Sequence, residues 1–277
     1  SSEQFKLKFD CLGTYYDANT EKDFINVVGV VVSQAMNATS CQVNLLDKKL
    51  RPVETNSLMS IYDAATKKLL FNYEHTMNGR GVPDTLFLDP KIKYDLKVNT
   101  VPAVEIKNIA IKPHTHNIIQ VDAGQGQLKV TSLKSPSGTK IETRILQNNA
   151  SPTLNVQQLN DVQRYLVGSY QLEILTLPRT YKDIKIDQSK VTAIDIVAAG
   201  QLTYTSGKGL VGQIFYERNP GQWEWVLDLK ENQATGSWNL QPGSYKIVYR
   251  EKEQRSSAYT KEKKFNIATL NTTNLTL

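Results

Sequence analysis

The sequence predicts a mostly β protein: three tandem β-sandwich modules preceded by a short α/β segment with one helix. Two observations carry this prediction. From Cys41 onward, short strand-like runs alternate with turn residues, and a set of residues recurs at intervals of 76 and 75 positions. Strands and helices do not alternate along the sequence, so a parallel α/β sheet is not expected.

The α/β segment occupies residues 1–40. FKLKFD alternates apolar and charged residues, which predicts a strand over residues 5–10. Thr20 and Asp23 have the spacing of a helix capping box. They precede a predicted helix over residues 21–36, whose apolar side chains fall on one stripe: Phe24, Val27, Val28, Val31 and Ala35.

The stretch from Cys41 to Asp122 has the strand density of a β-sandwich. Strand-like runs bounded by turn residues follow one another: CQVNLLD, SLMSIYDA, KLLFNYEH, DTLFLD, KYDLKVNT, VEIKNIAI and HNIIQVD. So many short strands in so few residues are typical of immunoglobulin-like or prealbumin-like sandwiches.

One string of residues recurs along the chain. Residues 94–102 read YDLKVNTVP and residues 170–178 read YQLEILTLP, 76 positions later. A looser copy starts at Tyr245, 75 positions after Tyr170. The tyrosine and the alternate apolar residues share one strand face, and sheets favour every residue type in the string. The repeat therefore predicts a core strand that ends at the proline, and no binding motif.

The tripeptide Ala-Gly-Gln recurs at the same interval, at 123–125 and 199–201. A period this long is unlike a solenoid repeat and suits a small domain with its own core. The tripeptides mark junctions, so we predict modules at residues 41–122, 123–198 and 199–277.

Charge patterning argues against a nucleic-acid partner, and hydropathy argues against a membrane span. The formal charge is +6, from 33 basic and 27 acidic residues. Lysines and glutamates are interleaved, which is typical of a solvated surface and unlike the clustered basic face of a nucleic-acid binder. The apolar run over residues 27–32 is too short to cross a bilayer, so this region is not expected to span a membrane.

Metal and cofactor chemistry have little support in the sequence. Cys11 and Cys41 allow one disulfide or two buried thiols, but they cannot form a zinc site of cysteines alone. His114 and His116 have the spacing of two transition-metal ligands. No third ligand lies near them, so an exposed polar turn is favoured. We expect no metal and no cofactor.

No catalytic group is predicted either. His75 ends a strand-like run beside Glu74, and no serine or cysteine can be placed as its nucleophilic partner. We therefore expect that the protein is not an enzyme.

Two tryptophans are the candidates for ligand binding. Trp223 and Trp225 alternate in GQWEWVLDL and share one strand face, with Tyr216 shortly upstream. If exposed, they form a platform for a sugar ring or for a partner's apolar side chain. If buried, they belong to the core, which the size of their rings favours, as it does for Trp238.

Several strings resemble a known family. VNLLDKKLRPVETNSLMSIYDAATKKLLFNYEH, YLVGSYQLEILTLPR and LQPGSYKIVYR are similar to the C-terminal region of secreted von Willebrand factor type A domain proteins of Bacteroidota. In that family a metal-binding type A domain precedes β-sandwich modules. The resemblance implies that FKLKFD and the valine-rich helix are the last strand and helix of such a domain. The family's Asp-x-Ser-x-Ser metal motif is absent from all 277 residues, so no metal ligand is transferred.

Taken with this resemblance, the sequence predicts a non-enzymatic, exported protein of the cell envelope. It would act as a stalk and as an adhesion surface for other envelope or secreted proteins, located in the periplasm, at the outer membrane or outside the cell. Strand addition at a sheet edge is the expected mode of binding. The alternative is an assembly of carbohydrate-binding modules that holds glycans on Trp223 and Trp225.

Overall fold

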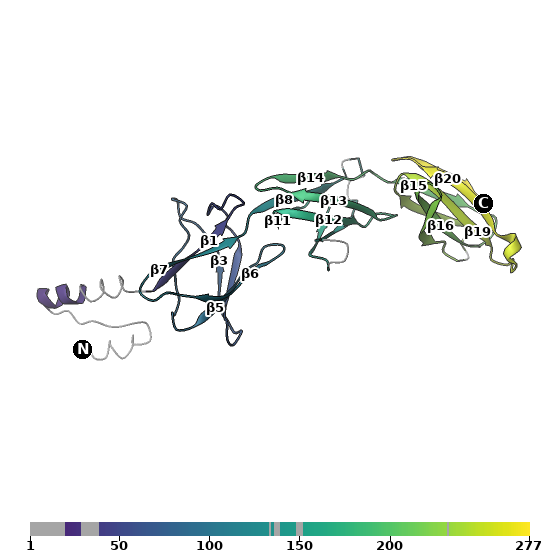
Figure 1. Ribbon diagram of the computed structural model, residues 1–277. Helices are drawn as coiled ribbons and strands as arrows, with labels where there is room; N and C mark the ends of the chain where they lie inside the picture. The colour runs from purple at the N-terminus through teal and green to yellow at the C-terminus, as the bar shows by residue number, and fades with distance from the viewer. Residues whose placement is uncertain (1–19, 29–38, 133, 136–138, 148–151, 232) are drawn as a thin grey trace. The chain divides into compact units, whose positions relative to one another are not determined.

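The computed structural model describes residues 20–28, 39–132, 134–135, 139–147, 152–231 and 233–277 (Figure 1). The predicted fold class is confirmed: the described chain consists mainly of β-strands arranged in six sheets. These sheets form three successive pairs along the chain. The chain divides after Ala123 into two compact units. The second unit contains two of the three sheet pairs.

Residues 21–28 form the helix, which begins where the sequence predicts. The hydroxyl of Thr20 accepts a hydrogen bond from the backbone N–H of Asp23 at 3.1 Å and donates one to the Asp23 carboxylate at 2.6 Å. Of the described residues of the apolar stripe, Phe24 is 61% exposed and Val28 is 42% exposed, while Val27 is partly buried. The strand predicted over 5–10 and the remainder of the predicted helix lie outside the described residues. In the described part of the chain, no helix has the length and apolar character of a membrane span.

The first sandwich packs a three-stranded sheet, β4-β1-β7, against a four-stranded sheet, β3-β2-β5-β6. Buried residues of both sheets form its core, among them Leu45, Ile61 and Val121. The strands are β1 (Ser40–Leu46), β2 (Leu58–Asp63), β3 (Leu69–Glu74), β4 (Leu86–Phe87), β5 (Lys93–Val98), β6 (Val104–Ala110) and β7 (His116–Asp122).

The second sandwich has the same strand order, with sheets β11-β8-β14 and β10-β9-β12-β13. Its strands are β8 (Gln125–Thr131), β9 (Glu142–Leu146), β10 (Asn155–Gln158), β11 (Val162–Leu166), β12 (Gly168–Ile174), β13 (Thr180–Ile186) and β14 (Val191–Asp195).

The third sandwich repeats this order again, with sheets β18-β15-β21 and β17-β16-β19-β20, and adds a short 3₁₀ helix, η1 (Ser257–Tyr259). Its strands are β15 (Gly200–Thr205), β16 (Leu210–Asn219), β17 (Gln222–Asp228), β18 (Thr235–Leu240), β19 (Gly243–Glu251), β20 (Lys261–Ile267) and β21 (Thr272–Thr276).

The first and last strands of every sandwich are parallel neighbours. β1 pairs with β7 over seven residue pairs, β8 with β14 over five, and β15 with β21 over five. The first strand is therefore the middle strand of its sheet, between the last strand and the fourth.

The repeated tyrosines occupy one position in each sandwich. Tyr94, Tyr170 and Tyr245 lie in β5, β12 and β19 and are buried. Each hydroxyl donates to a carbonyl four or five residues upstream, for example from Tyr170 to Leu166 at 2.8 Å. This contact is like the tyrosine corner of immunoglobulin domains. Burial raises the pKa of Tyr170 to about 12, so its hydroxyl remains a donor at neutral pH.

The prolines that end the repeated string lie in matching turns. Val101–Pro102 and Leu177–Pro178 are both cis peptide bonds. The hydroxyl of Thr100 donates to the Pro102 carbonyl at 2.6 Å, and that of Thr176 donates to the Pro178 carbonyl at 2.8 Å. The Thr-x-Pro part of the string thus forms the turn from β5 to β6 and from β12 to β13, as expected of a proline that ends pairing.

We expect Tyr170→Phe to loosen the second sandwich by leaving the Leu166 carbonyl without its donor. A net loss of about 1 kcal/mol is typical of one buried hydrogen bond. Amide hydrogen exchange in β12 of the intact chain should then be about fivefold faster. Tyr259→Phe is the control, because Tyr259 is exposed. Unchanged exchange in Tyr170→Phe would contradict the assigned role of the hydroxyl.

Candidate functional site

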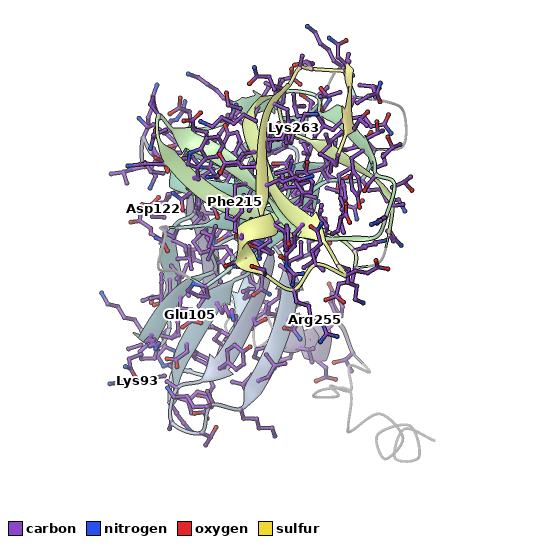
Figure 2. All side chains as sticks on the ribbon, turned by 90° about the vertical axis from the view of Figure 1, so that its right-hand side faces the viewer. Lys93, Glu105, Asp122, Phe215, Arg255 and Lys263 are labelled. Atoms are coloured by element: carbon purple, nitrogen blue, oxygen red, sulfur yellow. The ribbon has the colours of Figure 1, made fainter. Side chains whose placement is uncertain are left out.

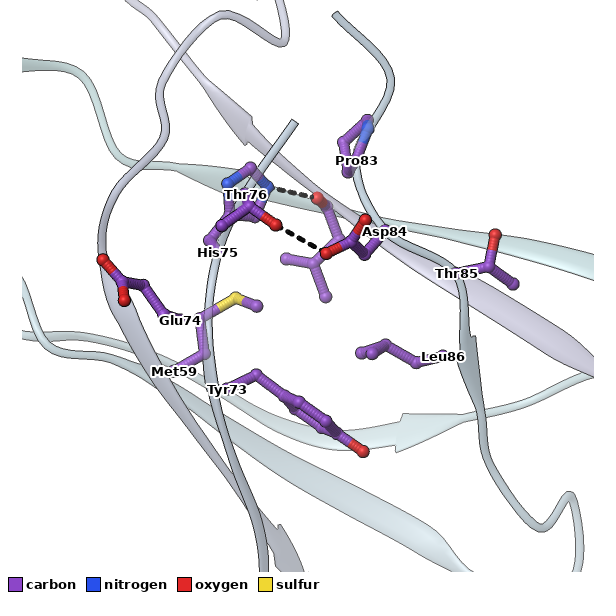
Figure 3. A pocket seen from close by; sticks show the side chains of 10 residues that line it. Met59, Tyr73, Glu74, His75, Thr76, Pro83, Asp84, Thr85 and Leu86 are labelled. Carbon is purple, nitrogen blue, oxygen red and sulfur yellow. Dashed lines mark hydrogen bonds between the residues drawn. The ribbon is translucent and has the colours of Figure 1, made fainter. Parts of the chain in front are cut away.

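The first sandwich contains a pocket of about 350 Å³ between the ends of β3 and β4 (Figure 3). We call it the edge pocket. Its volume lies within the range of small ligand sites. It is lined by Val43, Met59, Tyr73, Glu74, His75, Thr76, Pro83, Asp84, Thr85 and Leu86.

The edge pocket has an apolar floor and an acidic rim. Val43, Met59 and Leu86 are buried at its base. Glu74 and Asp84 are exposed at its mouth. The hydroxyl of Thr76 donates to the Asp84 carboxylate and so fixes its position (Figure 3). Such a pocket matches a ligand group that is apolar along its length and positive at its tip.

His75 is a structural member of this pocket. Its ring is buried, with Nε2 2.9 Å from the Val43 carbonyl and Nδ1 3.2 Å from the Thr55 hydroxyl. On this side β1 pairs with β4 only at Ser40 and Cys41. The imidazole of His75 donates to the Val43 carbonyl beyond that short pairing. The imidazole therefore supplies the hydrogen bond that a backbone N–H of a longer β4 would otherwise donate to β1.

Trp223 and Trp225 lie on the outer face of the third sandwich, so the core position favoured for them is wrong. Trp225 is 57% exposed and Trp223 is half-buried. The reason is a β-bulge: Ile214 pairs with Leu227, but Phe215 pairs with Trp225. Val226 is the extra residue of the bulge and has no partner on β16. The bulge therefore places Trp225 on the same face as Phe215, whereas regular pairing would have placed it on the face of Tyr216.

Phe215, labelled in Figure 2, pairs with Trp225 and lies on the same face as the two tryptophans. In the same cross-strand row lie Lys246 and Lys264. Their ammonium groups are 4.8 and 5.6 Å from the centre of the Trp223 ring, which is cation–π distance. This face is therefore aromatic and partly basic.

Tyr216 does not belong to that face, contrary to its place among the predicted ligand-binding residues. Strand alternation turns it inward, where its ring packs 5.1 Å from that of Tyr245. The Arg218 guanidinium lies over the Tyr216 ring at 5.2 Å. Trp238 packs against the core, as expected, and stacks on Tyr204.

Of the two histidines considered as metal ligands, His114 lies in the turn before β7 and His116 is the first residue of β7. His116 has its ring nitrogens 2.9 Å from the Ser40 hydroxyl and 3.0 Å from the Gln42 side-chain oxygen. His114 occupies a left-handed turn, with φ of 57°. Within the described ranges, no three His, Cys, Asp or Glu side chains gather as a metal site requires.

Cys41 is a free thiol in the core of the first sandwich. Burial raises its pKa to about 11, which keeps the thiol protonated and unreactive at neutral pH. Cys11 lies outside the described residues.

An ion cluster around one buried carboxylate in the second sandwich was not predicted. Glu173, part of the repeated string, is only 5% exposed. Its carboxylate accepts hydrogen bonds from the guanidinium groups of Arg144 and Arg179. Arg144 meets Glu173 because β9 and β12 pair in a register that places these residues opposite each other. The turn at Pro178 brings Arg179 back to the same carboxylate.

No family model and no curated protein matches this chain. Among solved structures, the TIE protein of Bacillus anthracis is 14% identical, with 87% of this chain and 51% of that chain covered and a TM-score of 0.24. This chain thus spans about half the length of that protein. The minor pilin GBS52 of Streptococcus agalactiae is 12% identical, with coverages of 56% and 94% and a TM-score of 0.31. A streptococcal ancillary pilin is 10% identical, with coverages of 86% and 98% and a TM-score of 0.29. Likenesses this slight carry no argument about function.

We expect His75→Leu to destabilise the first sandwich by roughly 2 kcal/mol, because it leaves the buried Val43 carbonyl without a donor. Hydrogen exchange in β1 of the intact chain measures this loss. Lys93→Gln is the control, since Lys93 is exposed on β5 in the other sheet and a polar replacement there costs little. Equal protection of β1 in the wild type and in His75→Leu would show that the imidazole does not close the sheet.

Proposed function

We propose that this chain is a non-enzymatic, exported stalk of a cell-envelope assembly, built to resist tension and to contact other proteins. The observation that carries the proposal is the parallel pairing of the first and last strands in all three sandwiches.

Parallel pairing determines how a sandwich responds to a pull. The chain enters at the start of β1 and leaves at the end of β7, which lie about 20 Å apart along the strand pair. A pull on these ends slides the two strands past each other. All seven residue pairs are then strained together, whereas strands pulled from one end would separate pair by pair. Forced unfolding is governed by the unfolding barrier, which such loading keeps high.

The non-enzymatic part of the proposal is supported by the state of the reactive side chains. Both ring nitrogens of His75 are engaged in structural contacts. The raised pKa of Cys41 removes its thiol from nucleophilic chemistry at neutral pH.

The likeness to type A domain proteins of Bacteroidota stays a prediction, and the proposed export depends on it. The encoded sequence upstream of Ser1 tests this likeness. An Asp-x-Ser-x-Ser motif there would support it, and an unrelated domain would contradict it.

We expect pulling on the two ends of the chain to give three unfolding events in single-molecule force spectroscopy. Each should lengthen the chain by about 240 Å, because a repeat of 76 residues extends about 3.4 Å per residue and the ends of the folded strand pair already lie about 20 Å apart.

The direction of pull tests the parallel-strand argument within the first sandwich. Handles at Thr39→Cys and Asp122→Cys load β1 and β7 in shear, while handles at Thr39→Cys and His114→Cys unzip them. Both chains carry Cys11→Ser, and the buried thiol of Cys41 stays unlabelled. We expect a higher unfolding force in shear. Equal forces, or a higher force on unzipping, would remove the basis of the proposal.

A second candidate function is glycan binding, which the exposure of Trp225 favours. We nevertheless expect neutral glycans to leave tryptophan fluorescence unchanged, because Lys246 and Lys264 already lie over the Trp223 ring. A fluorescence change that is lost in Trp225→Ala, and kept in Val156→Ala on the second sandwich, would favour the glycan function instead.

A further inference from the structure

The first sandwich has an open edge between β3 and β4. We propose that an extended segment of a partner protein adds alongside β3 and places a lysine or arginine side chain in the edge pocket. The inference rests on the proposed role in protein contacts and names where and how such a contact is made.

All three sandwiches have their third strand at a sheet edge, but only in the first is the neighbouring fourth strand this short. Its fourth strand, β4, pairs with β1 at only two residue pairs. The corresponding strands pair over five residues in the second sandwich, β11 with β8, and over six in the third, β18 with β15. The short β4 leaves the facing part of β3 without a covering strand.

The short β4 leaves partly exposed two aromatic side chains of β3 that lie on the inner face of the sheet. Phe71 and Tyr73 pair with Ile61 and Met59, which are buried in the core. Phe71 is nevertheless 39% exposed, and the two aromatic rings stack at 5.7 Å. An inward-facing aromatic row at a sheet edge is a surface that a further strand would cover.

The chemistry of β3 also permits strand addition. In the four-stranded sheets the opposite edges carry lysines, a device that discourages pairing with other chains. These are Lys107 in β6, Lys182 and Lys185 in β13, and Lys261, Lys263 and Lys264 in β20. β3 has no lysine and exposes Leu69 as well as Phe71.

The edge pocket determines which side chain the added strand would bring. Its lining residues include two carboxylates, Glu74 and Asp84, and no lysine or arginine. This contrasts with the net charge of +6 on the whole chain. The methylenes of a lysine or arginine would lie on Met59 and Leu86, with the positive group at the Asp84 carboxylate. The Glu74 carboxylate points to the other side of β3 (Figure 3) and adds negative charge to the neighbourhood. The Tyr73 ring offers a further face for the cation.

Selection from a library of random nine-residue peptides on the intact chain tests this site. The expected consensus has β-branched residues around one lysine or arginine. In a complex with the selected peptide, the amides of β3 should exchange more slowly, because the added strand pairs with them. Higher salt should weaken binding, since the anchor is ionic.

Matched variants separate the edge pocket from the rest of the surface. We expect the double variant Glu74→Gln, Asp84→Asn to bind the selected peptide at least about tenfold more weakly. Replacing the basic residue of the peptide by norleucine should cause a similar loss. Glu105→Gln, on β6 at the other edge of the same sheet, should bind as the wild type does. Far-UV circular dichroism confirms that each variant is folded.

Any one of the following results would overturn the inference: no selected peptide, a consensus without a basic residue, binding that survives the double variant, or protection that appears away from β3. Free arginine amide binding as tightly as the peptide would show a small-cation pocket and would also overturn it. None of these results bears on the resistance of β1 and β7 to shear. The pulling experiment alone therefore tests the stalk proposal.

Discussion

The parallel pairing of the first and last strands is the constraint on which each sandwich depends. It makes the first strand the centre of its sheet, with the last strand on one side and the fourth on the other. It also places the entry of the chain at one end of the strand pair and its exit at the other end. Because the last strand always fills one side, variation between modules falls on the fourth strand. The short β4 and the edge pocket beside it are such a variation.

Much of the fold could be predicted because strand alternation and turn residues are local signals. HNIIQVD coincides with β7, since Ile119 and Val121 alternate with polar residues in a run bounded by turn residues. The repeated string predicts a core strand for the same reason. Its tyrosine hydroxyl needs only a carbonyl a few residues upstream, so even that contact is local.

The errors have the opposite origin, since they concern features that only strand pairing determines. Trp225 faces outward because a bulge opposite Phe215 inserts Val226, and nothing in GQWEWVLDL announces that bulge. Arg144 and Glu173 are 29 residues apart and meet only through the register of β9 and β12. The edge pocket combines residues of β1, β2, β3 and β4 with both ends of the loop that connects β3 to β4. The edge pocket therefore cannot be predicted from the sequence of any single strand.

The two proposed activities occupy different sheets of the first sandwich, and this separation has a physical consequence. Tension passes through β1 and β7 in the three-stranded sheet, while a partner strand would join β3 in the four-stranded sheet. Adding a strand at β3 breaks no hydrogen bond of the β1–β7 ladder, so docking need not weaken the sandwich under load. His75 is the exception, because it lines the edge pocket and also bonds the Val43 carbonyl on β1. An occupant that displaced this imidazole would loosen the middle strand of the tension-resisting sheet, whereas one held by Asp84 at the rim would leave it in place.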